Sequence, residues 1–161
     1  MQLTSPDISQ DKAVPQAHVF DGFGCSGGNL APLLSWSDAP PETKSFALTL
    51  YDPDAPTGSG WWHWVAYNLP ARSQNNQAVQ RSANQPQLDG GIRQALNDFG
   101  TYNYGGPCPP EGSPPHRYVF TVHALKVPSI ELPEGASAAT VRFMIHANTL
   151  ASAAITARHG R

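Results

Sequence analysis

Two segments of the chain carry the residue types that could do chemistry. Residues 50–64 read LYDPDAPTGSGWWHW, and residues 105–118 read GGPCPPEGSPPHRY. Each segment combines a histidine with prolines and aromatic rings, and the first adds the carboxylates of Asp52 and Asp54. Imidazole and carboxylate groups held together suit either proton transfer or the binding of a small anion.

The strands predicted around these segments would bring them together. Residues 46–51 (FALTLY) read as one strand, and residues 61–69 read as another that ends at Pro70. Residues 117–127 (RYVFTVHALKV) have the strongest strand pattern in the chain, because β-branched and aromatic residues alternate there. If these strands are neighbours, the histidines of the two segments face each other beside Asp52.

The tryptophans should divide between the site and the packing of the sheet. Side chains alternate along a strand, so Trp61 and His63 should lie on one face, with Trp62 and Trp64 on the other. We therefore assign Trp61 to the site with His63, and the other two tryptophans to packing.

The second segment predicts groups that would hold an anion. His116 and Tyr118 should share a face by the same alternation. A nearby carboxylate favours the cationic imidazole, which donates from both nitrogens to a phosphate or carboxylate oxygen. Gly105 and Gly106 would let backbone N–H groups approach the same anion. We therefore predict a small, rigid anion pocket whose affinity falls as pH rises through the histidine range.

Three other interpretations remain open. Asp52, His63 and His116 form a conceivable two-histidine, one-carboxylate metal set, although we expect neither a metal nor a cofactor. The same residues could be the acid–base groups of a hydrolase or lyase, but the only nearby serines, Ser59 and Ser113, lie in no nucleophile motif. The third interpretation is an interaction protein in which the pocket has no ligand.

The bulk composition argues against several classes of partner. The chain has 161 residues, a formal net charge of −2 and 14% charged residues, so it lacks the basic excess that nucleic-acid binding requires. No apolar run approaches the roughly 18–20 residues of a membrane span. The N-terminus has no signal-peptide pattern, so we expect a cytoplasmic protein. Tryptophan and proline at predicted surface turns also lead us to expect a homodimer.

The two cysteines, Cys25 and Cys108, have two readings. In the cytoplasm they would usually be reduced thiols, and two cysteines are too few for a structural zinc site. Both lie in predicted turns near the site, so a disulfide between them stays an open alternative.

The remainder of the chain predicts a β-rich domain with its helix at the end. Residues 1–24 read as one or two short strands, and residues 32–36 as another. Residues 71–98 are polar and read as a long surface excursion. Residues 137–158 lack Pro and Gly, are rich in Ala, and predict one C-terminal helix or two in succession. We expect a single domain over residues 1–161, mainly β (α+β).

Four linked motifs resemble the phosphatidylethanolamine-binding protein family, in its bacterial, Raf-kinase-inhibitor-like branch. The motifs are D-P-D-A-P at 52–56, G-W-W-H-W at 60–64, Y-G-G-P-C-P-P at 104–110 and H-R-Y-V-F at 116–120. N-L-A-P-L-L-S-W at 29–36 and N-D-F-G at 97–100 extend the resemblance over nearly the whole chain.

The resemblance implies a large antiparallel sheet packed on a smaller sheet, with C-terminal helices. It also implies a cis X-Pro bond near the first motif, and a pocket for phosphate, acetate or phosphoethanolamine-like groups. Carried onto this sequence, the ligand-binding residues are Asp52, Ala55, Pro56, Trp61, His63, Gly106, Pro107, His116 and Tyr118. We therefore expect a binding protein that modulates or inhibits a signalling protein or protease, with an enzyme as the alternative.

Overall fold

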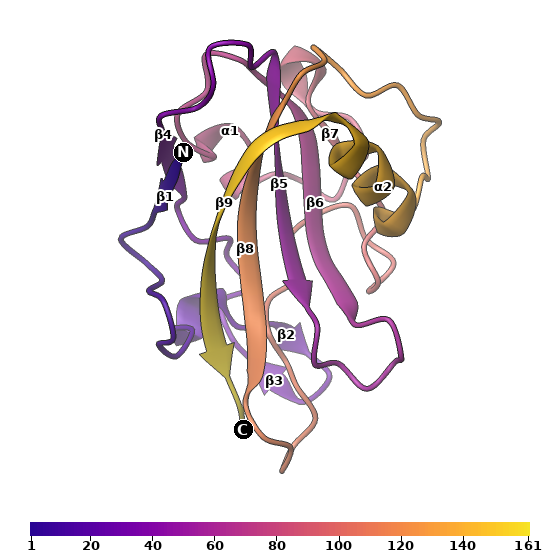
Figure 1. Ribbon diagram of the computed structural model, residues 1–161. Helices are drawn as coiled ribbons and strands as arrows, with labels where there is room; N and C mark the ends of the chain where they lie inside the picture. Colours follow the sequence, from indigo (N-terminus) through magenta and orange to yellow (C-terminus); the bar gives the residue numbers. More distant parts are fainter.

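A five-stranded antiparallel sheet forms the centre of the molecule, as the computed structural model of residues 1–161 shows (Figure 1). Its strand order is β7-β6-β5-β8-β9. The strands are β5 (Ser45–Asp52), β6 (Trp61–Pro70), β7 (Arg93–Gln94), β8 (His116–Leu125) and β9 (Thr149–His159). The three long predicted strands are thus present, and they are adjacent in the sheet.

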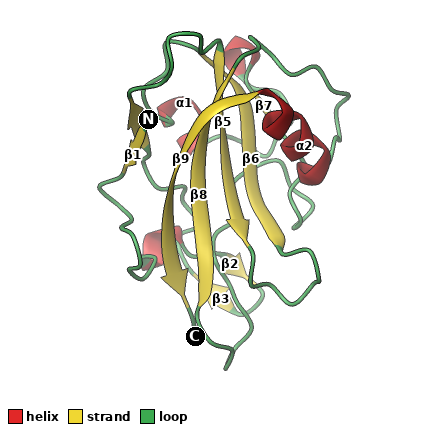
Figure 2. Ribbon diagram, viewed as in Figure 1, coloured by secondary structure: helices red, strands yellow, loops and turns green.

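Short elements surround this sheet (Figure 2). Two small antiparallel sheets pair β1 (Gln2–Thr4) with β4 (Ser35–Ser37) and β2 (Asp21–Gly22) with β3 (Cys25–Ser26). The helical elements are η1 (Gln16–His18), α1 (Gln77–Gln80), η2 (Asp89–Gly91) and α2 (Ala138–Asn148). The predicted mainly β class is confirmed. No helix reaches the length and hydropathy that crossing a membrane would need.

The two faces of the central sheet bury separate apolar clusters. On one face, Leu48 and Phe120 belong to the larger core, which the N-terminal third of the chain covers. On the other face, Ala47 packs with Val141 and Ile145 of α2. This division follows from the alternation of side chains along each strand, which places neighbouring residues in different cores.

The C-terminal part of the chain corrects the predicted helix over residues 137–158. The helix begins as expected, with the Ser137 side chain accepting a hydrogen bond from the Thr140 N–H, but it ends at Asn148. The residues that follow form β9, which pairs along the whole of β8. Ile155 and Ala157 are buried at a spacing of two, so pairing with β8 overrides the helical propensity of the alanines.

The predicted surface excursion at residues 71–98 is only partly exposed. Asn76 is completely buried, and its side chain accepts from the Leu34 N–H at 2.9 Å and donates to the Pro32 carbonyl at 2.9 Å. Gln94 is also buried, and its side chain accepts from the Trp64 indole N–H at 3.0 Å. These amides are satisfied inside the protein, so polar composition alone was a poor guide to exposure here.

Cys25 and Cys108 form a disulfide, with their Cα atoms 6.0 Å apart. The prediction of reduced thiols is therefore wrong, and the alternative of a bond between them is correct. The bond joins β3 to the loop that precedes β8, two parts of the chain separated by 83 residues. All peptide bonds are trans, so the implied cis X-Pro bond is also absent.

Candidate functional site

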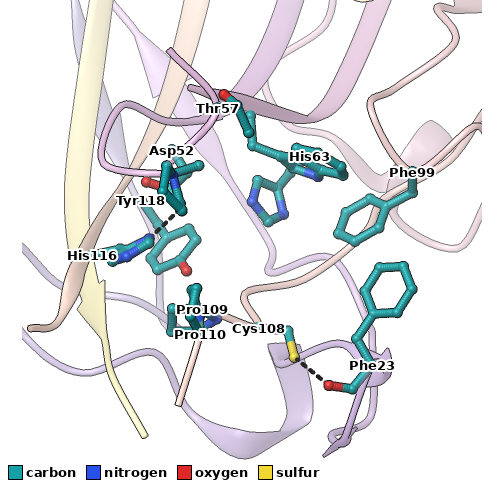
Figure 3. Close-up of a pocket in the computed structure, with 13 residues that line it drawn as sticks. Phe23, Asp52, Thr57, His63, Phe99, Cys108, Pro109, Pro110, His116 and Tyr118 are labelled. Atoms are coloured by element: carbon teal, nitrogen blue, oxygen red, sulfur yellow. Dashed lines mark hydrogen bonds and ion pairs between the residues drawn. The ribbon is translucent and has the colours of Figure 1, made fainter. Parts of the chain in front are cut away.

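A cavity of about 190 Å³ lies at the end of the sheet where β5 ends and where β6 and β8 begin (Figure 3). The antiparallel pairing places these three strand ends side by side, with Asp52 opposite Trp61. Seven of the nine predicted residues line the cavity: Asp52, Ala55, Pro56, Trp61, His63, His116 and Tyr118. The remaining lining residues are Phe23, Thr57, Phe99, Cys108, Pro109 and Pro110.

Asp52 and His116 form a buried pair on one side of the cavity. The His116 Nδ1 lies 2.7 Å from the Asp52 Oδ2, and both side chains are almost fully buried. The other carboxylate oxygen of Asp52 accepts the Asp54 N–H at 2.8 Å, which closes the turn after β5. Because Asp52 only accepts, His116 presents its proton at Nδ1 to the carboxylate and leaves Nε2 without a protein partner.

Asp54 is turned away from this pair. It accepts hydrogen bonds from the backbone N–H, Nε and Nη2 of Arg117, at 2.8, 3.0 and 2.8 Å. This contact with a guanidinium lowers the pKa of Asp54 to about 2. The two carboxylates of the turn therefore have different tasks: Asp52 orients an imidazole, and Asp54 ties the turn to β8.

His63 lies across the cavity and is held by the loop before β8. Its Nδ1 lies 2.7 Å from the Gly105 carbonyl oxygen, and the Gly105 N–H donates in return to the His63 carbonyl at 3.1 Å. Burial lowers the pKa of His63 to about 4, although the Gly105 carbonyl and the charge of Asp52 oppose that shift. His63 is therefore neutral near pH 7, and the prediction that both imidazoles are cationic is wrong for this one.

Tyr118 lies between the two imidazoles. Its ring stacks on His116 with centroids 6.4 Å apart and meets His63 edge-on at 5.4 Å. The residue is fully buried, and its hydroxyl is the only buried side-chain polar atom in the protein without a hydrogen-bond partner. Burial, the negative charge of Asp52 and the proximity of that carboxylate raise the pKa of this phenol, so the hydroxyl keeps its proton and remains a donor.

The metal alternative finds no support in this arrangement. No group of three His, Cys, Asp or Glu side chains in the protein is arranged to hold a metal ion. Asp52, His63 and His116 all line the cavity, but Asp52 and His116 bind each other, and the Nδ1 of His63 is bound to a carbonyl.

Comparison with known proteins identifies the family. A family model described as "Phosphatidylethanolamine-binding protein" matches residues 4–160. This chain belongs to the phosphatidylethanolamine-binding protein family. It is 50% identical over 157 residues to the UPF0098 protein YbhB of Escherichia coli (strain K12), with 98% of each chain covered. The predicted resemblance is thus confirmed.

Solved structures with a similar fold support this architecture. The crystal structure of E. coli YbcL, described as a new member of the mammalian family, superposes with a TM-score of 0.90 at 45% identity, covering 99% of this chain and 98% of that one. A carboxypeptidase Y inhibitor complexed with its cognate proteinase has a TM-score of 0.57 at 18% identity, covering 99% and 82% of the two chains. At that identity the likeness shows the fold alone.

Gly106 and Pro107, the other two of the nine predicted residues, do not line the cavity. Gly106 donates its N–H to the Asn29 side chain at 2.8 Å, and an added Cβ would overlap the His18 carbonyl oxygen. The Pro107 carbonyl accepts the Phe20 N–H at 3.0 Å. The expectation that glycine N–H groups approach the anion is therefore wrong, because the N–H groups of Gly105 and Gly106 are already bound within the protein.

The tryptophan pattern of the family's second motif also departs from simple alternation. Leu50 pairs with Trp64 and Tyr51 with Trp62, so His63 is an extra residue in a β-bulge. As a result Trp64 enters the larger core, while Trp62 packs against the α2 side of the sheet. Both tryptophans serve packing, as predicted, but they do not share a face.

Two aromatic residues that line the cavity, Phe99 and Phe23, were not predicted from the sequence. Phe99 contacts His63 and Trp61 edge-on, with centroids 5.2 and 5.4 Å apart, and stacks on Phe20 at 4.3 Å. Phe23, at the tip of the β2–β3 hairpin, is 70% exposed and lies beside Phe99. Phe99 belongs to the N-D-F-G motif, which we used only for the family resemblance, and no pattern in the sequence places Phe23 at this cavity.

The disulfide fixes the Phe23 hairpin against the cavity. Cys108 lines the cavity and is bonded to Cys25, two residues after Phe23. Its sulfur lies 3.6 Å from the Phe23 carbonyl oxygen, a packing contact because a disulfide sulfur has no proton to donate (Figure 3). Arg161 adds a second tie, since its Nε donates to the Pro109 carbonyl at 2.7 Å and its Nη2 to the Phe23 carbonyl at 3.3 Å.

Proposed function

We propose that this member of the phosphatidylethanolamine-binding protein family binds a small anion in the cavity, such as phosphate, acetate or a phosphoethanolamine-like group. The observation that carries the proposal is the buried hydroxyl of Tyr118, which has no partner in the protein and faces a cavity. A buried donor without an acceptor costs about 1–3 kcal/mol, and a bound anion would remove that cost.

The groups around the hydroxyl support an anion as the ligand. His116 is held at Nδ1 by Asp52, and when its ring is protonated Nε2 becomes a second donor beside Tyr118. Trp61 and Phe99, together with the prolines at 109 and 110, form apolar walls, in which a charge-assisted hydrogen bond is stronger than in water. A cavity of about 190 Å³ has room for a phosphate or a small phosphoester.

Titration calorimetry with inorganic phosphate tests this proposal. Tyr118→Phe should weaken binding about tenfold or more, because it removes a hydrogen bond to a charged ligand. Tyr102→Phe is the matched control, since Tyr102 lies outside the cavity, and it should leave the affinity unchanged. Absence of phosphate, acetate and phosphoethanolamine binding, or equal affinity of Tyr118→Phe and wild type, would contradict the proposal.

The biological role proposed for the pocket is modulation or inhibition of a signalling protein or protease. The support is membership of the phosphatidylethanolamine-binding protein family. Inhibition assays against a protease panel test it, and the predicted homodimer is measured by analytical ultracentrifugation.

The cytoplasmic location stays a prediction. The Cys25–Cys108 disulfide weighs against it, because such bonds are rare where thiols are kept reduced. Thiol labelling of the protein directly on extraction from cells decides whether the bond exists in its own compartment.

One observation favours a second candidate, a hydrolase or lyase. The Asp52–His116 pair, which lines the cavity, resembles an oriented general base whose Nε2 has no partner in the protein. Neither Ser59 nor Ser113 lines the cavity, so a water would have to be the nucleophile in a hydrolysis. Turnover of a phosphoester and acyl-ester panel that is lost in His116→Ala would establish this activity.

A further inference from the structure

The neutral imidazole of His63 gives the cavity a hydrogen-bond acceptor as well as donors. The Gly105 carbonyl oxygen can only accept, so the short contact of 2.7 Å places the ring proton of His63 on Nδ1. Nε2 then carries a lone pair. It has no hydrogen-bond partner in the protein, and the ring lines the cavity.

This orientation of His63 is held from several sides. The Gly105 N–H and the Asn97 side chain both donate to the His63 carbonyl, at 3.1 and 3.3 Å. The Phe99 ring lies edge-on to the imidazole on one side, and the Tyr118 ring on another. A flipped ring would lose the bond from Nδ1 and place a C–H group against the Gly105 carbonyl, so the acceptor stays directed at the cavity.

We propose that the cavity selects a phosphoryl group that still carries a proton over an oxyanion without one. The protonated oxygen of the ligand would donate to Nε2 of His63, and its charged oxygens would accept from Tyr118 and from His116. Inorganic phosphate and a singly protonated phosphomonoester share this chemistry. The inference rests on the proposed function and specifies the ligand class of the same site.

Sulfate is the matched probe because it has the same tetrahedral shape and no proton near neutral pH. In this cavity its oxygens would face the lone pair of His63, close to the carboxylate of Asp52. Two acceptors facing each other in a buried site cannot form a hydrogen bond. A site built for a hydrogen bond rejects an isostere that lacks the donor.

Titration calorimetry at pH 7.5 and constant ionic strength, with sodium phosphate and sodium sulfate as the two ligands, tests the inference. Wild-type protein should bind phosphate about tenfold or more tightly than sulfate. His63→Gln should bring the two affinities within about threefold, because the amide can turn its NH₂ group toward the ligand. Tyr118→Phe is the control: it removes a donor that both ions use, so both affinities should fall and their ratio should persist.

Each outcome bears on a different claim. Sulfate binding within about threefold of phosphate in the wild type would overturn the selectivity and leave the anion site intact. If neither ion binds, the proposed function itself fails, and this inference fails with it. The wild-type comparison needs no variant to fold. In addition, ¹⁵N spectra of His63 should show Nε2 becoming a hydrogen-bonded acceptor with phosphate and not with sulfate; an unchanged Nε2 signal on phosphate binding would overturn the assignment.

Discussion

Two buried histidines should make this protein lose stability in mild acid. His63 at the cavity and His123 on the opposite face of the sheet are both almost fully buried. Burial is the main cause that lowers their pKa values, to about 4 and about 3. Unfolding returns both to 6.5, so below that pH the unfolded chain binds more protons than the folded one. The stability that these two neutral imidazoles contribute is therefore fully present above pH 6.5. It is lost as the pH falls toward their folded-state pKa values.

The size of the loss follows from the same pKa values. For each of the two imidazoles, the free energy of unfolding falls by about 1.4 kcal/mol per pH unit below 6.5, as long as the pH stays above the folded-state pKa of that imidazole. At pH 5 that amounts to about 2 kcal/mol for each residue and about 4 kcal/mol for the two together. Asp54 adds nothing at this pH, because its lowered pKa matters only below 3.8. A loss of about 4 kcal/mol is a large part of the roughly 5–15 kcal/mol by which domains are stable.

Urea unfolding at pH 7 and pH 5 measures the effect. His123→Gln removes one titrating group and keeps a polar partner for the Thr49 hydroxyl, which lies 3.2 Å from the imidazole. The pH-dependent loss should shrink by about 2 kcal/mol in this variant. Lys12→Gln, at an exposed position outside both apolar clusters, is the control and should behave as the wild type. Equal losses in His123→Gln and wild type would refute the reasoning, as would a wild type with the same stability at both pH values.

Three further changes test single contacts that stabilise the fold. Reducing the Cys25–Cys108 bond, which joins residues 83 positions apart, should lower the free energy of unfolding by up to about 4 kcal/mol. The stability of a variant with serine at both positions should not change when the reductant is added. An unchanged urea midpoint of the wild type on reduction would refute this prediction. Gly106→Ala should destabilise by about 1–3 kcal/mol, because its Cβ would overlap the His18 carbonyl; wild-type stability would mean the two segments are not in close contact. Ser137→Ala removes the N-cap of α2 and should cost about 1 kcal/mol in the same assay, whereas no loss would show that this hydrogen bond contributes little.

Much of the candidate site could be predicted because its residues lie at the ends of neighbouring strands. Asp52 closes β5, Trp61 opens β6 and His116 opens β8. Strand runs are visible in sequence, and antiparallel neighbours bring the end of one to the start of the next. Two short motifs could therefore be placed at one end of one sheet before any coordinates were known.

The errors arose where a contact distant in sequence decides the outcome. The helix predicted beyond Asn148 became β9 because β8 offers a complete pairing partner, which local propensity does not register. The β-bulge at His63 places Trp62 and Trp64 on opposite faces of the sheet, where strict alternation predicts one face for both. A bulge changes the face of the side chains that follow it without any change in composition. The Phe23 hairpin is held at the cavity by the disulfide between Cys25 and Cys108, which are 83 residues apart in the sequence.

The sequence by itself determined the family, the mainly β class and the set of ionisable groups at the site. These depend on residue types, strand periodicity and motif order, all of which are local properties. Only the tertiary structure decided the protonation of those groups. Burial and the Gly105 carbonyl make His63 a neutral acceptor, while Asp52 orients His116 and the Tyr118 hydroxyl is left without a partner. Desolvation and hydrogen bonding depend on what surrounds a group in space, and that environment is assembled from segments far apart in the chain.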